Sequence, residues 1–576
     1  MSRIFVITEH DPLNRIQGNV GADKDTIACG FWSSVDSVRL IPGFDRKEVL
    51  SLNTTAKAYP AYVEKAYSLA HPIAENSPSY RGIRPLVAWE EFLADSILKV
   101  LVIGDFHQGL LDRHGPGPEV IFFSPNETQQ AFSLFNEVRD KPFRIKILQH
   151  RETGSRGRGV LGRLREFRNV VRESKREGRW GQVFWQPVEV LDDRYRMRSS
   201  VWPRARFETG GRWFYGSYVN YTRVLRRHRS DLNGQANWVV NQDAATRGLQ
   251  QDDRWHYLWQ FGKPSRTKDH ESFLREAVNY LQTLPLDRDG FPLRDFARSS
   301  TSLSYLVTRI LPSALSEVDL MDAFLKGAFP DELWVANQWG SEGELTMLAN
   351  ARGIPVTQVQ HGALHRYFAV SSILSKRFLV WGSFWRDVVR AEESRKIEVF
   401  NPGLDIIPVE RKRTKPNGKR ITFLTTPLHL GAFWNPDVTL QEVGALVKHL
   451  MQRGHTVLIR IHPSDRIEFW RRSLEGILGS IPPALRFSKE DSLVSVLQET
   501  DVAFMFFSTV FLNCVASGIP VIGLGWYPHI WQKPLERMGV VHFANSVQEA
   551  LDLVERLERA PDQTHLMGEF LADPSC

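Results

Sequence analysis

The chain is poor in cysteine, with only Cys29, Cys514 and Cys576 among its 576 residues. Three thiols this far apart match no zinc-site spacing and form no disulfide framework, so the sequence predicts a cytoplasmic protein. Long hydrophobic runs are also missing. The apolar run 4–7 is too short for a secretory signal, and no run approaches the roughly 20 apolar residues that span a bilayer. Any membrane contact is therefore expected to be peripheral.

The charge is positive overall but uneven along the chain. The formal net charge is +7, and the segment 151–179 alone holds ten Lys and Arg against four Glu. Such a segment is either a solvated helix face or a patch that binds an anionic partner. That partner would be the inner face of the cell membrane or a polyanionic substrate. Nucleic acid is not expected as a partner, because no zinc finger, RNA-binding sheet or helix-turn-helix pattern accompanies the charge.

Apolar runs alternate with helical patterns in the first part of the chain, as parallel βαβ units do. Residues 3–8 read as a strand and 89–97 as a helix, and the apolar run 100–105 reads as a strand that ends in Asp105. Another strand is expected at 120–123. The segment 151–298 differs, being rich in Arg, Trp and Tyr with little periodicity, and is interpreted as an insertion in the first domain.

Alternation resumes after Pro330, with a strand at 332–336, a helix at 341–351 and a strand at 356–360. A charged linker at 405–419 then precedes a second set of strands, expected at 420–424, 456–461, 502–507 and 520–524. Helices fit between them, at 440–452, 492–499 and 511–516. The sequence therefore predicts an α/β protein with an N-terminal domain over 1–404 and a C-terminal domain over 405–576.

Polar residues gather where these strands end, which is where doubly wound parallel sheets bind ligands. These residues are His361 and Gly362 in the first domain, and Thr425, Thr426, Arg460, His462, Pro463, Ser508 and Thr509 in the second. Hydroxyls, an imidazole and a guanidinium suit the phosphates of a nucleotide, and the glycine allows close backbone approach. The sequence therefore predicts a nucleotide site assembled from both domains.

Several of these runs together carry a resemblance to known enzymes. The runs are 334–337, 353–355, 360–362, 460–463, 508–509 and 516–522, with Asn513 between the last two. They resemble the bacterial capsule and wall polymer transferases, namely polysialyltransferase-like, capsular Kdo transferase-like and CDP-glycerol glycerophosphotransferase-like enzymes. The resemblance covers about 330–557. It differs in having Ser-Thr for the usual Ser-Ser pair and in lacking an acidic-acidic-glycine motif.

The resemblance implies a GT-B fold, with two Rossmann-like domains facing a central cleft. It implies that His361 is a catalytic or donor-contact residue and that His462, Ser508 and Thr509 bind the donor phosphate. Cytidine-linked donors, CMP or CDP, are implied in the same way.

The base that deprotonates an acceptor stays open among first-domain carboxylates, namely Asp105, Glu342 and Asp11, each of which also fits an ordinary loop or capping role. No Asp-x-Asp loop is present, so a metal-independent reaction without a cofactor is expected. Arg460 and His462 would then stabilise the phosphate.

The sequence thus predicts a glycosyltransferase that moves a sugar or sugar acid from a nucleotide-activated donor to a surface polysaccharide or a lipid-linked acceptor. A nucleotide-sugar 2-epimerase or a hydrolase on the same scaffold is the first alternative. A non-catalytic partner in polysaccharide assembly is the second.

Overall fold

The computed structural model describes residues 3–7, 26–30, 59–122, 127–147, 209–228, 236–362, 364, 372–400, 406–410, 418–426, 436–462, 465, 467–506, 508–524, 532–557 and 567–571, with short gaps inside 236–290 and at 390 and 407. Asp11, the basic segment 151–179 and Pro463 lie outside the described residues. No helix in the described ranges combines the length and the apolar character needed to cross a membrane.

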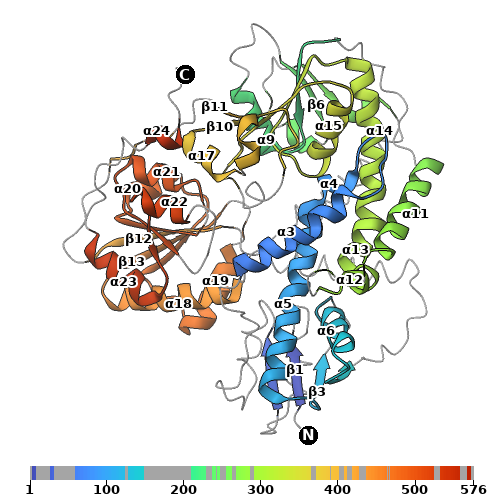
Figure 1. Cartoon of the computed structure of the whole chain (residues 1–576). Helices are drawn as coiled ribbons and strands as arrows, with labels where there is room; N and C mark the ends of the chain where they lie inside the picture. The colour runs from blue at the N-terminus through green and yellow to red at the C-terminus, as the bar shows by residue number, and fades with distance from the viewer. Residues whose placement is uncertain are drawn as a thin grey trace, which may run out of the picture.

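Three parallel sheets follow one another along the chain (Figure 1). The N-terminal sheet has the strand order β2-β1-β3-β4, the middle sheet β11-β10-β9-β8-β5-β6-β7, and the C-terminal sheet β14-β13-β12-β15-β16-β17. Every strand pair within them is parallel. The predicted fold class, α/β with parallel Rossmann-like sheets, is confirmed. The division at 404 and 405 and the central cleft stay predictions.

The N-terminal sheet is built from four short strands and is joined to the rest by helices. Its strands are β1 (Arg3–Ile7), β2 (Thr26–Gly30), β3 (Glu119–Phe122) and β4 (Arg144–Ile147). The helices are α3 (Tyr59–Glu75), α4 (Pro85–Ala88), α5 (Glu90–His114) and α6 (Glu127–Val138). The predicted strands at 3–8 and 120–123 are confirmed.

The strand predicted at 100–105 is wrong, because these residues lie in the middle of α5, a helix of 25 residues. Helix α5 contacts α3 and α6, so the apolar run is buried against other helices rather than in a sheet. A buried helix is apolar around most of its circumference, and a short apolar run therefore does not distinguish it from a buried strand.

The strands of the middle sheet come from two stretches of the chain, 212–257 and 332–399. They are β5 (Arg212–Gly216), β6 (Asn237–Val240), β7 (Arg254–Tyr257), β8 (Glu332–Val335), β9 (Val356–Val359), β10 (Arg377–Val380) and β11 (Ile397–Val399). The described part of the Arg- and Trp-rich segment thus supplies three strands of this sheet, which the sequence did not predict.

Helices and helical turns lie between these strands in the sequence. They are α9 (Val219–Arg227), α10 (Asp243–Thr246), η3 (Leu258–Gln260), α11 (Lys268–Gln282), α12 (Leu293–Ser299), α13 (Thr301–Tyr305), the π-helix η4 (Leu306–Ile310), α14 (Leu311–Ala328), α15 (Gly340–Ala351), α17 (Ser383–Val388) and η5 (Ala391–Lys396). The predicted helix at 341–351 is confirmed as α15, which ends before Gly353, a glycine at a φ of +73°.

Both faces of the middle sheet are buried along its central strands, such as β5, β6, β8 and β9, which explains why these strands lack the alternation of a half-exposed sheet. Successive residues of β5 point to opposite faces. Trp213 and Tyr215 join the largest hydrophobic cluster of the chain, while Phe214 stacks on Trp238 at 4.8 Å in a separate cluster with Trp334. These buried aromatic residues pack on both faces of β5.

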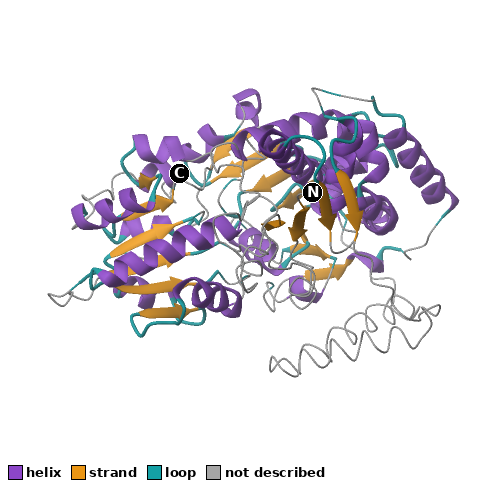
Figure 2. Cartoon of the chain, turned by 90° about the horizontal axis from the view of Figure 1, so that it is seen from below, coloured by secondary structure: helices purple, strands orange, loops and turns teal. Residues whose placement is uncertain are grey.

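The C-terminal sheet has the strands β12 (Arg420–Leu424), β13 (Thr456–Arg460), β14 (Leu485–Ser488), β15 (Val502–Met505), β16 (Val521–Leu524) and β17 (His542–Ala544). Its helices are α18 (Pro436–Gln452), α19 (Ile467–Leu478), α20 (Leu493–Gln498), α21 (Phe511–Ala516), α22 (Gln532–Arg537), α23 (Val547–Arg556) and α24 (Met567–Phe570). Figure 2 shows helices on both sides of these strands. All the strands and helices predicted for this part are confirmed within a few residues.

Helix α24 joins the middle sheet to the C-terminal sheet. It contacts α17, which follows β10, and α21, which follows β15. The Trp385 indole donates a hydrogen bond to the Phe570 carbonyl at 3.0 Å, and the Phe570 ring lies between Phe384 and Phe511 at 4.8 and 5.4 Å. The carboxyl ends of β10 and β15 are thereby held near each other.

Candidate functional site

The middle sheet reverses its strand order between β5 and β8. From β5 the chain moves outward to β6 and β7, and from β8 it moves outward the other way to β11. Ligands of open parallel sheets bind beyond the carboxyl ends of the strands at such a switch point. The residues that follow the central strands here are Ser217, Asn241, Ala336–Gln338 and Gln360–His361. We call this group and the side chains that contact it the middle-sheet edge.

Glu342 ties the two loops of the switch point together. It lies in the first turn of α15, is 1 % exposed, and accepts a hydrogen bond from the Ala336 backbone N–H at 3.0 Å. Its other oxygen accepts a short hydrogen bond from the Ser217 hydroxyl. Burial raises the pKa of Glu342 to about 8, while the hydrogen bonds from Ser217 and from the backbone act to lower it. With both oxygens occupied, Glu342 positions the loops and does not reach a substrate.

His361 presents one ring nitrogen away from its backbone partner. Its Nδ1 lies 3.1 Å from the Ala336 carbonyl, which only accepts, so Nδ1 carries the proton and Nε2 holds a lone pair. Burial lowers the pKa of the imidazole to about 4, although the bond to Ala336 acts to raise it. His361 is therefore neutral near pH 7 and is an acceptor for a hydroxyl group.

The Gln360 side chain fixes the loop that carries His361. The Gln360 side chain, 1 % exposed, donates to the Gly362 carbonyl at 2.7 Å and accepts from the Trp381 backbone N–H at 3.0 Å. Gly362 has a φ of +153°, a backbone conformation that favours glycine. The Gln-His-Gly run thus makes a rigid turn that presents the imidazole.

Tyr221 of α9 covers His361, with the two ring centroids 4.5 Å apart and the rings edge to face. The Asn337 amide donates to the Tyr221 hydroxyl at 3.2 Å. Burial, followed by the charges of Glu342 and Glu91, raises the pKa of Tyr221. Tyr218 is 55 % exposed, and its ring centroid lies 6.0 Å from that of Tyr221. It thus adds an exposed aromatic side chain beside Tyr221.

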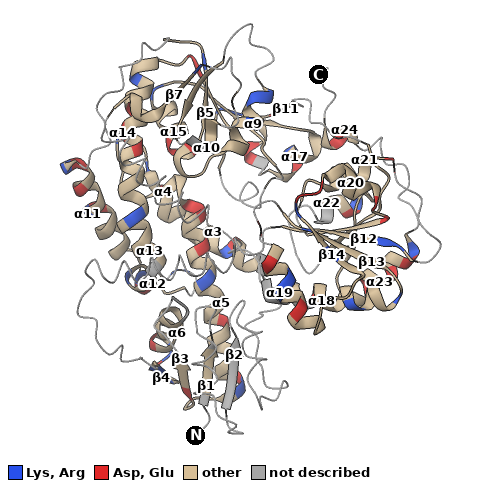
Figure 3. Cartoon of the chain, turned by 180° about the vertical axis from the view of Figure 1, so that it is seen from behind, with Lys and Arg blue, Asp and Glu red and all other residues tan. Residues whose placement is uncertain are grey.

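A second pair of carboxyl groups lies beside Glu342. Glu344, fully buried in α15, accepts from the Trp89 indole at 2.9 Å, and Glu317 of α14 accepts from Asn241 at 3.0 Å and from Tyr215 at 3.2 Å. Burial, then repulsion by Glu317, raises the pKa of Glu344 to about 8, and burial also raises that of Glu317. Figure 3 draws acidic residues in red where α15 lies beside α10 and α9.

The sequence prediction missed Glu91, Glu317 and Glu344 as members of this cluster. Glu91 lies in the first turn of α5, and burial followed by repulsion from Asp95 raises its pKa to about 8. A local signal existed for Glu344 alone, since it follows the predicted residue Glu342 by two positions in the same helix. Glu91 and Glu317 reach the cluster only through tertiary packing.

The C-terminal sheet has its own switch point, between β12 and β15. Thr425, directly after β12, accepts from the His462 backbone N–H at 2.9 Å and donates to the Arg460 carbonyl at 3.0 Å. The Thr425 and Thr426 side chains are 3 % and 5 % exposed. Thr425 therefore holds His462 at the strand end, and its hydroxyl is used within the protein.

Ser508 and Thr509 follow β15 at the same edge and are partly buried. The Ser508 hydroxyl accepts from the Val510 backbone N–H at 3.3 Å, so this serine also fixes its own turn. Asn513 lies one turn further on, in α21, and is partly buried. Together with His462 these residues form what we call the C-terminal edge.

Arg460 ends β13 and points along the sheet toward β14, where its guanidinium donates to the Ser488 hydroxyl at 3.3 Å. The described residues that directly follow β12, β13 and β15 include hydroxyls and an imidazole but no carboxylate. The two edges therefore differ in chemistry, because the middle-sheet edge is crowded with carboxyl groups.

Asp105 is not brought together with the other predicted residues. It lies on α5, contacts the Tyr62 hydroxyl, and is 14 positions along the helix from Glu91. At 1.5 Å per residue this is roughly 21 Å. The interpretation of Asp105 as a strand-end base is thus corrected, because the strand on which it depended is a helix.

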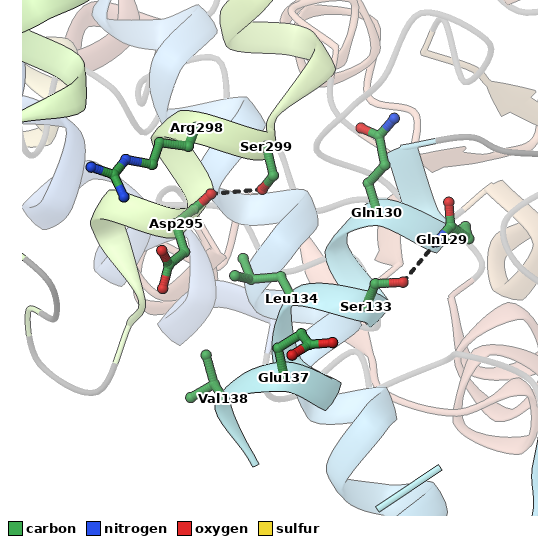
Figure 4. Close-up of a pocket in the computed structure, with 9 residues that line it drawn as sticks. All are labelled: Gln129, Gln130, Ser133, Leu134, Glu137, Val138, Asp295, Arg298 and Ser299. Atoms are coloured by element: carbon green, nitrogen blue, oxygen red, sulfur yellow. Dashed lines mark hydrogen bonds between the residues drawn. The ribbon is translucent and has the colours of Figure 1, made fainter. Parts of the chain in front are cut away.

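Two surface hollows among the described residues contain no predicted site residue. One, of about 500 Å³, lies between α6 and α12 and is lined by residues such as Ser133, Leu134 and Arg298 (Figure 4). The other, of about 580 Å³, lies between α11 and the π-helix η4. Across the described ranges no three His, Cys, Asp or Glu residues are placed to hold a metal ion. The expectation of a metal-independent reaction stays a prediction.

The sequence matches no protein-family model and no curated protein. The fold is similar to solved structures at low identity. A UDP-GlcNAc 2-epimerase from Neisseria meningitidis bound to UDP-GlcNAc shares 12% identity, with a TM-score of 0.36 over 64% of this chain and 95% of that one. A glycosyltransferase from Rickettsia africae shares 10%, with a TM-score of 0.36 over 60% and 87%. The O-GlcNAc transferase of Thermobaculum terrenum shares 10%, with a TM-score of 0.32 over 88% and 91%.

Similarity at this level identifies no substrate and no residue role. The resemblance to capsule and wall polymer transferases therefore stays a prediction.

Proposed function

We propose that the protein transfers a sugar or sugar acid from a nucleotide-activated donor to a hydroxyl group of an acceptor. One observation carries the proposal. Two parallel sheets each present a switch point, one rich in carboxyl groups with a neutral imidazole and the other rich in hydroxyls with an imidazole, and α24 holds their carboxyl ends near each other.

The different side chains at the two edges fit the donor and the acceptor of such a transfer reaction. Hydroxyl and imidazole donors suit phosphate oxygens, so the C-terminal edge is the proposed donor side, with His462, Ser508 and Thr509 in contact with the phosphates. The His361 lone pair accepts a hydrogen bond from a sugar hydroxyl, in a loop that the buried carboxyl groups hold in place, so the middle-sheet edge is the proposed acceptor side. A cytidine-linked donor and a surface polysaccharide or lipid-linked acceptor are proposed from the sequence resemblance.

The test is a thermal-shift screen with CMP, CDP, UDP, GDP and their sugars, followed by a transfer assay with the ligand that binds. A selective donor raises the melting temperature by mass action. His462→Ala and Ser508→Ala are each expected to lower turnover by about 10²-fold or more, as for loss of a preorganised electrostatic contact. The matched control is Ser495→Ala on α20, away from these strand ends. Near-wild-type turnover of both variants on a verified substrate would contradict the donor-side assignment.

Epimerisation of a nucleotide sugar is the second candidate, and the clustering of several proton acceptors at one edge favours it. Epimerisation removes a proton from carbon and returns one to the opposite face, which requires two acid–base groups rather than one. Incubating the bound nucleotide sugar in D₂O without an acceptor separates the two reactions. Deuterium incorporation without transfer supports the epimerase, and transfer without incorporation supports the transferase.

A further inference from the structure

Tyr218 lies between β5 and α9, at the N-cap position of the helix, yet its side chain makes no capping hydrogen bond. Ser, Thr, Asp and Asn normally occupy this position, because their oxygens accept from the first free N–H groups of a helix. The Tyr218 backbone serves α9 instead, since its carbonyl accepts from the N–H and the hydroxyl of Thr222 at 2.9 and 3.0 Å. The sequence thus places a large aromatic side chain, 55 % exposed, where the helix does not need one.

The backbone that carries the Tyr218 ring is held on both sides. Ser217, before it, donates its hydroxyl to Glu342 of α15, and Thr222, after it, closes the first turn of α9. The Tyr218 ring also has a neighbour, because its centroid lies 6.0 Å from that of Tyr221. A side chain positioned in this way loses little conformational freedom when a ligand covers it.

The Tyr221 hydroxyl has a proton to donate. The Gln338 backbone N–H donates to Asn337 Oδ1 at 2.8 Å, which fixes the orientation of the amide and directs its nitrogen elsewhere. That nitrogen donates to the Tyr221 oxygen at 3.2 Å. In the part of the chain that the structure describes, no group accepts a hydrogen bond from the Tyr221 hydroxyl, so its proton is available to a ligand.

His361 offers the complementary group. Its Nδ1 donates to the Ala336 carbonyl at 3.1 Å, which leaves the Nε2 lone pair as an acceptor. Nε2 has no donor among the described residues and is in contact with solvent, whereas both ring nitrogens of His228 are buried without a partner. The Tyr221 and His361 rings meet edge to face, with their centroids 4.5 Å apart. A donor and an acceptor therefore lie side by side at the middle-sheet edge.

An exposed aromatic ring beside an uncharged donor and an uncharged acceptor fits a sugar. A pyranose ring has C–H groups on its face, which pack on an aromatic ring, and hydroxyl groups around its rim, which both donate and accept. A hydrocarbon chain would cover the two polar groups and leave them without partners, which is costly. A phosphate or carboxylate would meet a lone pair, rather than a proton, on Nε2 of His361.

We propose that Tyr218, Tyr221 and His361 form a subsite for the acceptor sugar, an inference that rests on the proposed function. The face of the sugar ring packs on Tyr218. Two of its hydroxyl groups bind beside that ring, one donating to Nε2 of His361 and the other accepting from the Tyr221 hydroxyl. The sugar recognised here is therefore an uncharged pyranose unit with at least two free hydroxyl groups.

The first test needs no active donor and uses the methyl glycosides of glucose, galactose and N-acetylglucosamine as probes. Saturation-transfer NMR is expected to show signals from the pyranose ring of at least one probe with the wild type and to lose them with Tyr218→Ala. Tyr218→Phe keeps the aromatic ring and is expected to keep the signals. The control Tyr305→Ala, in which the replaced tyrosine is also 55 % exposed but ends α13, is expected to match the wild type.

The second test uses the acceptor found by the transfer assay. Tyr218→Ala is expected to raise the KM for the acceptor by roughly three- to tenfold, as for loss of an aromatic contact, with nucleotide affinity unchanged. Tyr221→Phe is expected to raise it by a similar factor, because one hydrogen bond is lost. The wild type is also expected to prefer the acceptor over one of its monodeoxy analogues, and Tyr221→Phe to lose that preference, which a purely structural role of the hydroxyl would not explain.

The melting temperature of Tyr218→Ala is expected to equal that of the wild type, because the ring is exposed. The subsite is overturned if no probe gives a signal with the wild type, or if the signals persist in Tyr218→Ala. Signals from the bases of cytidine or uridine that disappear in Tyr218→Ala overturn it as well, since Tyr218 would then hold a nucleobase. Glycoside binding that depends on Tyr218, in a protein that transfers no sugar, keeps the sugar subsite and contradicts the proposed function alone.

Discussion

Removing the Glu342 carboxyl group should destabilise the middle sheet, whereas replacing it by an amide should not. In Glu342→Ala the Ala336 N–H and the Ser217 hydroxyl both lose their buried acceptor. A buried donor without a partner costs about 1–3 kcal/mol, so the two together cost about 2–6 kcal/mol. At about 2–4 °C per kcal/mol for a unit of this size, the melting temperature should fall by about 4 °C or more.

Glu342→Gln keeps an oxygen for the Ala336 N–H and offers an N–H that the Ser217 oxygen accepts. The amide also resembles the protonated carboxyl group, which the raised pKa of about 8 favours below that pH. Thermal unfolding followed by tryptophan fluorescence reports on this sheet, because Trp213 and Trp238 are buried in it. The reasoning is refuted if the alanine variant melts with the wild type, or if the glutamine variant is as unstable as the alanine variant.

Three further predictions test other parts of the structure. Gly382→Ala should weaken the contact between α17 and α24, because the added Cβ would lie 2.3 Å from the Glu569 carbonyl oxygen. The control Gly568→Ala should not, because there is open space around its Cβ. Limited proteolysis should cleave the C-terminal segment faster in Gly382→Ala, and equal cleavage of the two variants would contradict this contact. The pKa of Glu344 is raised on folding from 4.5 to about 8, so its contribution to stability is full below pH 4.5 and is lost as pH rises toward 8. Between these pH values the free energy of unfolding should therefore fall less steeply with pH in Glu344→Gln than in the wild type, by up to about 1.4 kcal/mol per pH unit. An unchanged dependence of the unfolding free energy on pH would contradict the burial of this carboxyl group. His361→Asn keeps a donor for the Ala336 carbonyl but lacks Nε2, so it should keep the wild-type melting temperature and lose at least tenfold in kcat/KM, while equal activity would show that Nε2 meets no substrate.

The strands that precede His462 and Ser508 could be predicted from the sequence, because each is a short, mostly apolar run bounded by polar turn residues. The strand before His361 could be predicted because it directly follows a helix that ends before Gly353. Strands β5 and β6 could not, since both of their faces are buried and aromatic residues such as Trp213 and Phe214 occupy successive positions without a polar alternation. The strand prediction for the run that ends in Asp105 is wrong for a related reason, because an apolar run buried among helices has no visible period.

The acidic cluster is a tertiary feature with little local signal. The Trp89 indole and Glu344 are 255 positions apart, and Glu317 meets Tyr215 across 102. A glutamate in the first turn of a helix is common in any protein, and only the packing of α4 on α15 and the Trp89 hydrogen bond show that the start of α5 lies beside Glu344. The sequence could likewise not show that Glu342 and Thr425 are occupied within the protein, because their partners are backbone groups of neighbouring loops.

The central claim is that the C-terminal edge binds the nucleotide of an activated sugar, and hydrogen–deuterium exchange tests it most directly. With a saturating nucleotide that raises the melting temperature, peptides covering 420–426, 456–462 and 508–516 should exchange more slowly, while the strands of the N-terminal sheet should exchange as before. Protection confined to the N-terminal sheet, or unchanged exchange in all three C-terminal peptides, would contradict the account.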